Sequence, residues 1–411
     1  MLDLKLYELK LSGLIILRDL LSDEVIISFK KLLKLEKDDI ENFVSVYAEF
    51  CARLFSKNLD FGDYVKNLVI ENENIFLQNF LKNGQPAMTE QQELKEKTDI
   101  ELYDILKTEL MLLEELVAIS SKEVKEYFLP KNLQLEINLP EWKSEKLKLR
   151  KEYEDYLKAL PSRGFGIYSK VSAFWLESGK LVPVKHPHEP KLEELLFYER
   201  ERKAVLENIE AFVNGNSYNN ILLYGDAGTG KSTTIKDVAA HFKDRGIRII
   251  EVTKKELNGL PKIIEELYYN PLKFIIFIDD LSFSEKDKDF AAFKAILEGS
   301  ISDKGNNIMI CATSNRRHLI KETMADRSGD DIHLADTMQE LFSLSARFGL
   351  VVTFQKPDKD VYIGIVRELA KPLINEIGMD ELDKMAEAFA IKNGGRSPRT
   401  ARQFIASLLR L

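Results

Sequence analysis

Cysteine is scarce in this chain of 411 residues, and its two cysteines, Cys51 and Cys311, lie far apart in sequence. Two such thiols provide no disulfide framework, and they are typical of core side chains in a reducing cytoplasm. Long apolar runs are lacking as well. The longest near the start, residues 14–17, is far shorter than the ~20 residues of a membrane span. The N-terminus lacks the features of a signal peptide, so we expect a soluble cytoplasmic protein with no membrane contact.

Excess positive charge is also absent, because the formal net charge is -8 and the sequence pI is about 5.5. This balance argues against a broadly basic surface for nucleic acid, although it leaves room for a local basic patch. The sequence has no low-complexity tract and no repeat at a solenoid period. The length of 411 residues is enough for two or three domains, and a hydrophobic content of 45% allows sizeable cores.

Residues 221–234 combine a short apolar strand, a glycine-rich loop and the start of a helix that continues towards residue 240. The loop matches the pattern G-x-x-x-x-G-K-[ST] at Gly225, Gly230, Lys231 and Ser232. Glycines allow backbone N–H groups to surround phosphate oxygens, and the N-terminus of the following helix attracts the same anion. A glycine turn that precedes a lysine by chance is the alternative, but the flanking strand and helix disfavour it.

The pattern therefore predicts a nucleotide-binding loop. We expect Lys231 to neutralise charge on the β- and γ-phosphates, and Ser232 to offer its hydroxyl to Mg²⁺, which prefers hard oxygen ligands. The predicted contacts with the nucleotide come from Gly225, Asp226, Ala227, Gly228, Thr229, Gly230, Lys231, Ser232 and Thr233.

An apolar run at residues 274–278 ends in two carboxylates, Asp279 and Asp280. A continuous apolar run is typical of a strand buried on both faces of a parallel sheet, and α/β folds bind ligands at the carboxyl ends of such strands. We expect Asp279 to hold Mg²⁺ beside the glycine loop, directly or through water. Asp280 is expected to orient or deprotonate an attacking water. A strand that ends in an ordinary polar turn is the alternative.

A further apolar run starts at residue 307 and ends in polar side chains. Asn315 is the candidate for a hydrogen bond to the γ-phosphate or to the attacking water, and Ser314 and Thr313 are second choices. Together with strands predicted at 248–252 and 350–354, separated by helical segments, this run favours a largely parallel five-stranded sheet. The helical segments that follow residue 358 predict a small lid.

Residues 1–160 show helical spacing of apolar side chains and no chemical motif. They form either an ordinary helix-bundle core or an adaptor with a groove for a partner, and the sequence leaves both open. Residues 161–190 are expected to be a compact connector with short strands around Gly179. His186 and His188 lack further ligands at zinc-like spacing, so we prefer incidental histidines to a metal site.

The second half resembles the AAA+ ATPases over about half of the chain, because five elements occur in the AAA+ order. They are the glycine loop, the acidic strand end, Asn315, an arginine at 347 and a 394–399 segment with Arg396 and Arg399. Residues 220–225, 279–283, 312–319, 344–350 and 179–187 are also similar to a bacterial family catalogued as domain of unknown function 815. We therefore expect an AAA+ αβ core with helices on both faces of the sheet at residues 191–356 and a helical lid at 357–411.

The resemblance implies roles for several arginines. Arg347 is expected to act in trans, as an arginine finger on the nucleotide of a neighbouring subunit, and Arg327 is a second candidate. A guanidinium there stabilises charge on the transferring phosphoryl oxygens. Arg399 resembles the lid sensor that contacts the γ-phosphate, and Arg396 is a candidate to share this role. A surface salt bridge is the alternative for each arginine.

One position departs from the commonest AAA+ pattern, because Asp280 stands where glutamate is usual. Its side chain is shorter by about one bond, roughly 1.5 Å. We therefore expect slow turnover, with Glu285 as a distant alternative base. Initiators and helicase loaders that resemble this chain also carry Asp-Asp, so the difference does not exclude hydrolysis.

Together these features predict an ATP-binding, Mg²⁺-dependent ATPase that forms a homo-oligomeric ring or arc. Its work would be to remodel a protein or a protein–nucleic-acid assembly that is selected by the N-terminal helices. One alternative is a nucleotide-gated scaffold with little turnover, and another is a DNA-associated loader, which the acidic charge disfavours. The client, the pathway and the number of subunits do not follow from the sequence.

Overall fold

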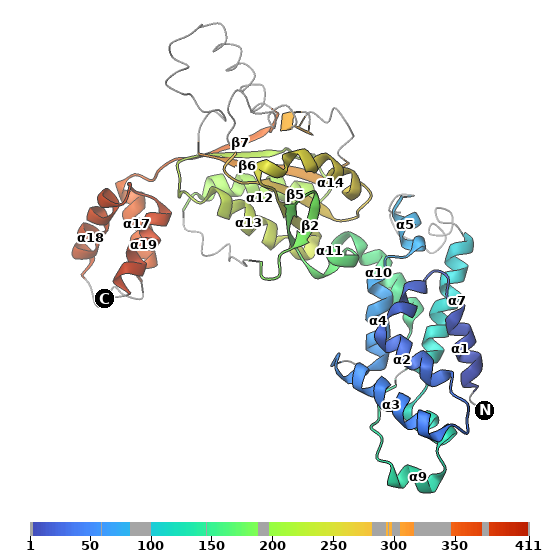
Figure 1. Cartoon of the computed structure of the whole chain (residues 1–411). Coiled ribbons are helices and arrows are strands. Elements are labelled where there is room, and N and C mark those ends of the chain that lie inside the picture. The colour runs from blue at the N-terminus through green and yellow to red at the C-terminus, as the bar shows by residue number, and fades with distance from the viewer. Residues whose placement is uncertain are drawn as a thin grey trace. The chain divides into compact units, whose positions relative to one another are not determined.

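The computed structural model contains two compact units (Figure 1). The first comprises residues 1–160 with 164–169, and the second comprises 161–163 with 170–411. The structure describes residues 3–58, 60–82, 100–144, 146–187, 197–281, 293–294, 296–297, 305–315, 347–371 and 378–409. None of the helices in these ranges is both long and apolar enough to cross a bilayer.

The first unit is helical, as the spacing of its apolar residues predicts. Its core contains fully buried aromatic side chains, among them Phe29, Phe43 and Phe50. The helices are α1 (Leu4–Ser12), α2 (Glu24–Leu33), α3 (Ile40–Phe55), α4 (Phe61–Glu71), α5 (Ile75–Lys82), α7 (Ile100–Val117), α8 (Ser121–Phe128), α9 (Lys131–Glu136), α10 (Leu149–Arg163) and α11 (Gly166–Lys170), with a 3-10 turn η1 (Arg18–Ser22).

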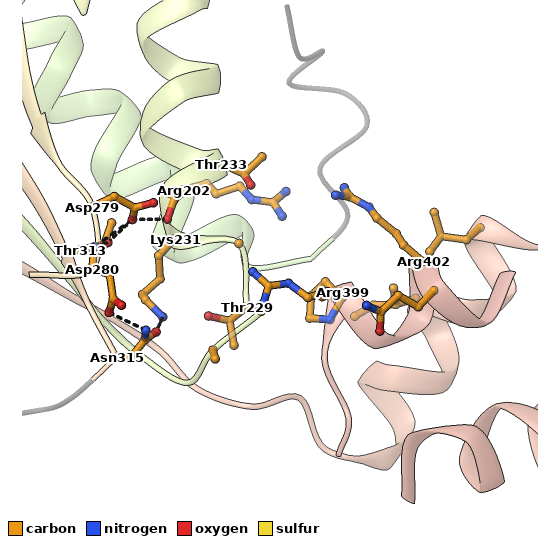
Figure 2. A pocket seen from close by; sticks show the side chains of 18 residues that line it. Arg202, Thr229, Lys231, Thr233, Asp279, Asp280, Thr313, Asn315, Arg399 and Arg402 are labelled. Atoms are coloured by element: carbon orange, nitrogen blue, oxygen red, sulfur yellow. Dashed lines mark hydrogen bonds between the residues drawn. The ribbon is translucent and has the colours of Figure 1, made fainter. Parts of the chain in front are cut away.

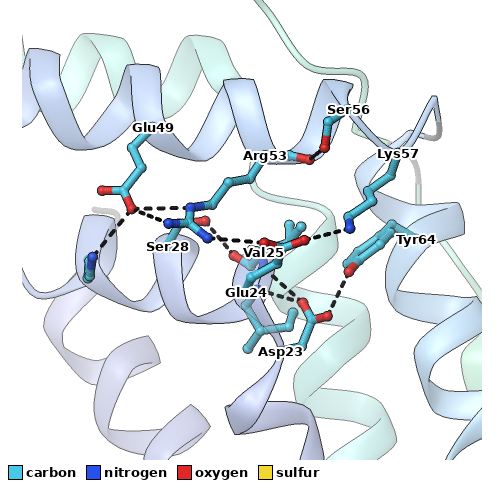
Figure 3. Close-up of polar contacts among 11 residues, drawn as sticks. Asp23, Glu24, Val25, Ser28, Glu49, Arg53, Ser56, Lys57 and Tyr64 are labelled. Carbon is cyan, nitrogen blue, oxygen red and sulfur yellow. Dashed lines mark hydrogen bonds and ion pairs between the residues drawn. The ribbon is translucent and has the colours of Figure 1, made fainter.

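Polar contacts connect the helices of this unit to one another (Figure 3). Asp23 caps α2 by accepting hydrogen bonds from the N–H groups of Val25 (2.9 Å) and Ile26 (3.0 Å), and its other oxygen accepts from the Tyr64 hydroxyl at 2.7 Å. Burial and the bond to Asp23 raise the pKa of Tyr64, so the phenol stays a donor. Arg53 of α3 contacts Glu24 of α2 at 3.2 Å. These contacts fix α2 against α3 and α4.

The second unit is built on a seven-stranded sheet in the order β2-β1-β4-β5-β6-β3-β7. All neighbours are parallel except the pair β1–β2. The strands are β1 (Ala173–Glu177), β2 (Lys180–Pro183), β3 (Ile221–Gly225), β4 (Ile247–Glu251), β5 (Lys273–Ile278), β6 (Ile308–Ser314) and β7 (Leu350–Phe354). The predicted five-stranded parallel core is confirmed. The short strands expected around Gly179 add a hairpin to its edge at β4.

Helices α12 (Glu199–Val213) and α13 (Lys231–His241) pack on this sheet through apolar side chains that include Val205, Ile209 and Val238. A third helix, α14 (Leu260–Leu267), buries one apolar face. Two 3-10 segments, η3 (Lys243–Arg245) and η4 (Lys254–Gly259), lie between these elements in sequence. Because β3, β5 and β6 are parallel, their carboxyl ends lie together at the same end of the sheet.

The lid prediction is also confirmed, because α17 (Lys359–Leu369), α18 (Met379–Lys392) and α19 (Pro398–Leu408) share one hydrophobic core. The sequence Ser397-Pro398 explains where α19 begins. The Ser397 hydroxyl accepts a hydrogen bond from the Thr400 N–H at 3.0 Å, and proline fits the first turn because it lacks an N–H that would need a partner.

Candidate nucleotide-binding site

The glycine loop connects the end of β3 to the start of α13, as predicted. Its first glycine, Gly225, has φ +138°, and a Cβ there would lie 2.0 Å from the carbonyl oxygen of Phe354 in β7. Only glycine therefore lets the loop leave the sheet at this point. Gly230 has φ +98° and caps α13, so that the helix begins at Lys231.

Lys231 is almost completely buried beneath the loop. Its Nζ donates hydrogen bonds to the carbonyl oxygens of Gly225 and Asp226, both at 2.8 Å, and to Oδ1 of Asn315 at 3.0 Å. Burial lowers the pKa of Lys231, while nearby carboxylates, Asp226 foremost, oppose that shift. The side chain thus brings a cation from α13 to the amide that follows β6.

The two aspartates after β5 meet the loop and β6 (Figure 2). Ser232 donates its hydroxyl to Asp279 Oδ1 at 2.6 Å, and Thr313 donates to the same oxygen at 2.5 Å. The amide of Asn315 donates to Asp280 Oδ1 at 2.7 Å. The structure therefore brings Ser232, Asp279, Asp280, Asn315 and Lys231 into one polar network, although they come from α13 and the ends of two strands.

Asp280 has a left-handed backbone with φ +51°. This conformation costs an L-residue roughly 1–2 kcal/mol, and Asp and Asn tolerate it best because their short polar side chains form local hydrogen bonds. The Asp280 N–H donates to Thr313 Oγ1 at 2.9 Å and to Asp279 Oδ1 at 3.1 Å. The shorter residue at this position, which the sequence shows as a departure from the AAA+ pattern, thus suits the local backbone.

The lid contributes the opposite side of the site. The N–H of Arg399 donates to the carbonyl oxygen of Gly228 at 3.3 Å, so the lid contacts the loop through backbone atoms. The Arg399 and Arg402 side chains of α19 both line the cavity, together with Arg202 of α12 (Figure 2). Burial lowers the pKa of Arg202 to about 10; Asp237 opposes the shift and Arg402 adds to it.

Sequence reasoning overlooked Arg202 and Arg402. Arg402 follows Arg399 by three residues, and this spacing places both on one face of a helix, so a signal for it was present. Nothing near Arg202 in the sequence indicates a site, because the lid and α12 approach each other only in the folded unit.

The cavity has a volume of about 510 Å³. Among the residues that the structure describes, the cationic side chains of Arg202, Lys231, Arg399 and Arg402 line it, against the carboxylates of Asp279 and Asp280. This described part of the lining therefore carries a net charge of +2. The lining also includes Ala227, Gly228, Thr229, Gly230, Ser232, Thr233, Thr313 and Asn315.

Two predicted loop contacts do not line the cavity. The Asp226 carboxylate accepts a hydrogen bond from the Lys356 N–H at 3.2 Å, which connects the loop to the segment between β7 and the lid. Gly225 lies at the base of the loop, against Phe354. Within the residues described, both therefore shape the loop from outside the cavity.

Arg347 lies elsewhere. It precedes β7, whose first residue pairs with the first residue of β3. Arg347 therefore lies at the amino-terminal ends of these parallel strands, and the glycine loop follows the carboxyl end of β3. There it lines a second cavity beside the asparagine-rich turn at residues 215–220. The structure does not bring Arg347 into the site formed by its own chain.

The remaining residues that the sequence singled out are Arg396, Arg327, Glu285 and the two histidines His186 and His188. Arg396 Nε donates to Glu387 at 2.9 Å, an interaction within the lid. His186 is exposed, and no group of three or more His, Cys, Asp or Glu side chains able to hold a metal occurs in the part of the chain that the structure describes. Arg327, Glu285 and His188 lie outside the described residues.

Comparison with curated proteins found no match. Among solved structures, the Thermotoga maritima RuvB Holliday junction branch migration motor has 16% identity and a TM-score of 0.38, with 54% of this chain and 64% of that chain covered. This chain thus spans less than two thirds of that structure's length. The FIGL-1 AAA domain in complex with ADP has 18% identity and a TM-score of 0.37, covering 54% and 73%.

The replication initiator DnaA bound to AMPPCP and single-stranded DNA is a third similar structure, with 21% identity, a TM-score of 0.35, and coverage of 54% of this chain and 64% of that one. A family model described as protein of unknown function (DUF815) matches residues 169–410, which is more than half of the chain and includes the hairpin, the sheet and the lid. The chain therefore belongs to the DUF815 family.

Proposed function

We propose that the protein is a cytoplasmic, Mg²⁺-dependent ATPase of the AAA+ type. The observation that carries the proposal is the 2.6 Å contact between Ser232 of the glycine loop and Asp279. It places a hydroxyl and a carboxylate beside the N-terminus of α13, which is where a phosphate-bound metal would lie. Lys231 and the Asp280–Asn315 pair lie in the same network.

The oxygen donors in the site fit Mg²⁺. Magnesium is usually held by one or two protein oxygens together with phosphate oxygens and water, and Ser232 Oγ and the Asp279 carboxylate supply such oxygens. Bound there, the metal would neutralise charge on the phosphate oxygens. The lining charge of +2 also balances the charge of about −2 that a magnesium–ATP complex carries when its phosphates are fully ionised.

The chain's own groups then have distinct tasks. Lys231 donates all three Nζ protons to protein oxygens in this structure and would exchange these bonds for contacts with the β- and γ-phosphates, and Arg399 would contact the γ-phosphate from the lid. Asp280 would accept a hydrogen bond from the attacking water and take its proton, while Asn315 holds the Asp280 carboxylate in place through the 2.7 Å bond.

The position of Arg347 supports an oligomer. An arginine at the sheet edge away from its own loop is suited to act on the nucleotide of a neighbouring copy. The protein would then form a ring or arc with shared sites, and the first helical unit would select the protein or protein–nucleic-acid assembly that is remodelled.

A nucleotide-gated switch with little turnover is the second candidate. The Asp280 carboxylate already accepts a hydrogen bond from Asn315 and belongs to a short side chain, and both features disfavour rapid proton abstraction. Turnover per site separates the two candidates.

The test is steady-state ATP hydrolysis of the full chain at increasing protein concentration, with the mass measured by light scattering in ATP. Arg347→Ala is compared with Arg245→Ala, which removes an exposed arginine just before β4, at the same sheet edge, where it contacts Glu210 and Asn214. We expect specific activity to rise with concentration, and only Arg347→Ala to bind ATP without turnover. A monomer that binds ATP and hardly hydrolyses it supports the switch instead, and a chain that binds no nucleotide refutes both.

A further inference from the structure

Thr313 lies beside both Asp279, the proposed metal ligand, and Asp280, the proposed base. It is the next-to-last residue of β6 and is 1% exposed. The pairing of Ile278 in β5 with Ala312 in β6 places it directly beside the end of β5. Its carbonyl oxygen accepts a hydrogen bond from the Leu281 N–H at 2.7 Å, so β6 holds the chain on both sides of Asp280.

The Thr313 hydroxyl has one proton and can donate only once. That proton goes to Asp279 Oδ1 at 2.5 Å, and the oxygen accepts from the Asp280 N–H at 2.9 Å. The hydroxyl therefore both donates and accepts a hydrogen bond within the protein. Because its one proton is already donated and Thr313 is buried, it does not serve as a donor to a phosphate. Any effect of Thr313 on the reaction passes through the two aspartates.

These bonds control the direction of each carboxylate. The bond to Oδ1 fixes the rotation of the Asp279 carboxylate that Ser232 also contacts. The bond from the Asp280 N–H supports the left-handed backbone of that residue, from which its carboxylate reaches the amide of Asn315. One hydroxyl thus orients both acidic groups relative to the glycine loop.

We propose that Thr313 is the positioning residue of this site, which aims Asp279 at the metal and holds Asp280 in the left-handed turn from which it faces the attacking water. The inference rests on the proposed function. It adds to it a residue that determines how strongly nucleotide binding and hydrolysis depend on Mg²⁺. Hydrogen-bond partners of metal ligands change metal affinity or activity by about 10–100-fold when they are removed.

The experiment uses Thr313→Val, which keeps the shape and removes the hydroxyl, and Thr313→Ser, which keeps the hydroxyl. Thr353→Val in β7 is the matched control for the same change in a neighbouring part of the sheet. The affinity for ADP is measured by calorimetry with Mg²⁺ and again with EDTA, and the Mg²⁺ concentration that gives half-maximal ATP hydrolysis is measured separately.

We expect Thr313→Val to bind ADP in EDTA with the affinity of wild type. The factor by which Mg²⁺ increases the affinity for ADP should fall at least about tenfold in this variant. The Mg²⁺ concentration that gives half-maximal ATP hydrolysis should rise correspondingly. Thr313→Ser should stay within about threefold of wild type on this scale, and Thr353→Val should not change. If Thr313→Val fails to fold, Thr313→Ala removes the same hydroxyl without adding a methyl group and replaces it in each measurement.

Two results would overturn the inference while leaving the proposed function intact. One is a Thr313→Val protein whose magnesium dependence equals that of wild type. The other is an equal loss of ADP affinity with and without Mg²⁺, which would assign Thr313 to nucleotide binding in general. A wild-type protein that binds no nucleotide in either condition would instead refute the proposed function.

Discussion

Gly225→Ala should destabilise the second unit far more than Gly230→Ala, although both glycines have positive φ in the same loop. A Cβ on Gly225 would lie 2.0 Å from the Phe354 carbonyl oxygen and 2.7 Å from its carbon. A Cβ on Gly230 would meet nothing within 4 Å. The pair therefore separates backbone conformation from steric conflict.

The magnitudes follow from these contacts. A disfavoured backbone conformation costs about 1–3 kcal/mol at either position. At Gly225 the loop must in addition move away from β7, which breaks the 3.1 Å hydrogen bond from the Asp226 N–H to Phe354, a loss of about 1–3 kcal/mol. We expect Gly225→Ala to lower the free energy of unfolding by about 2–6 kcal/mol and Gly230→Ala by about 1–3 kcal/mol, with the larger loss at Gly225.

Native-state hydrogen exchange with mass spectrometry, on the full chain without nucleotide, gives this free energy for the second unit alone from peptides of β3 and β5. Peptides of the first unit serve as an internal control and should not change. Equal destabilisation by the two substitutions would show that the approach of Gly225 to β7 is not what requires glycine there.

Three further predictions concern single side chains. Lys231→Ala should weaken ADP binding by at least about 100-fold in calorimetry, because it removes a buried cation. The control Lys236→Ala, in the same helix but paired with Glu251, should bind ADP like wild type. Equal ADP affinities of Lys231→Ala and Lys236→Ala would refute the loop assignment. Asp280→Glu should lower the free energy of unfolding, because glutamate tolerates the left-handed backbone less well than aspartate; an equally stable variant in denaturant titration would contradict this. Burial raises the pKa of Cys51 to about 11 and raises that of Cys311 further, so neither thiol should react with a disulfide reagent near pH 8 until the protein unfolds, and rapid native labelling would contradict the burial.

Much of the second unit follows from local sequence patterns. The glycine spacing determines a strand, a loop and a helix, and parallel strands bring Asp279 and the end of β6 to the same edge of the sheet. For this reason the sequence was enough to predict that Ser232, Asp279 and Asn315 would lie close together. Their chemical roles stay predictions.

Other features depend on contacts between distant segments. The sequence indicates short strands around Gly179 but not that they pair with β4, because strand order is set by tertiary packing. The approach of Arg202 to the lid has the same origin. The position of Thr313 behind Asp279, where it cannot also donate to phosphate, depends on hydrogen-bond geometry that spacing alone does not contain.

The β1–β2 hairpin has a consequence for solubility. Without it, β4 would be an edge strand with unpaired backbone groups and a mostly buried, apolar sequence, which is a template for pairing between molecules. With it, that edge of the described sheet ends instead in β2, four largely exposed residues from Lys180 to Pro183. A short edge strand that begins with a lysine and ends in a proline resists edge-to-edge aggregation. Because the family match begins at residue 169, this protection lies within the region that defines the family, and a fragment cut after the hairpin would be expected to self-associate through β4.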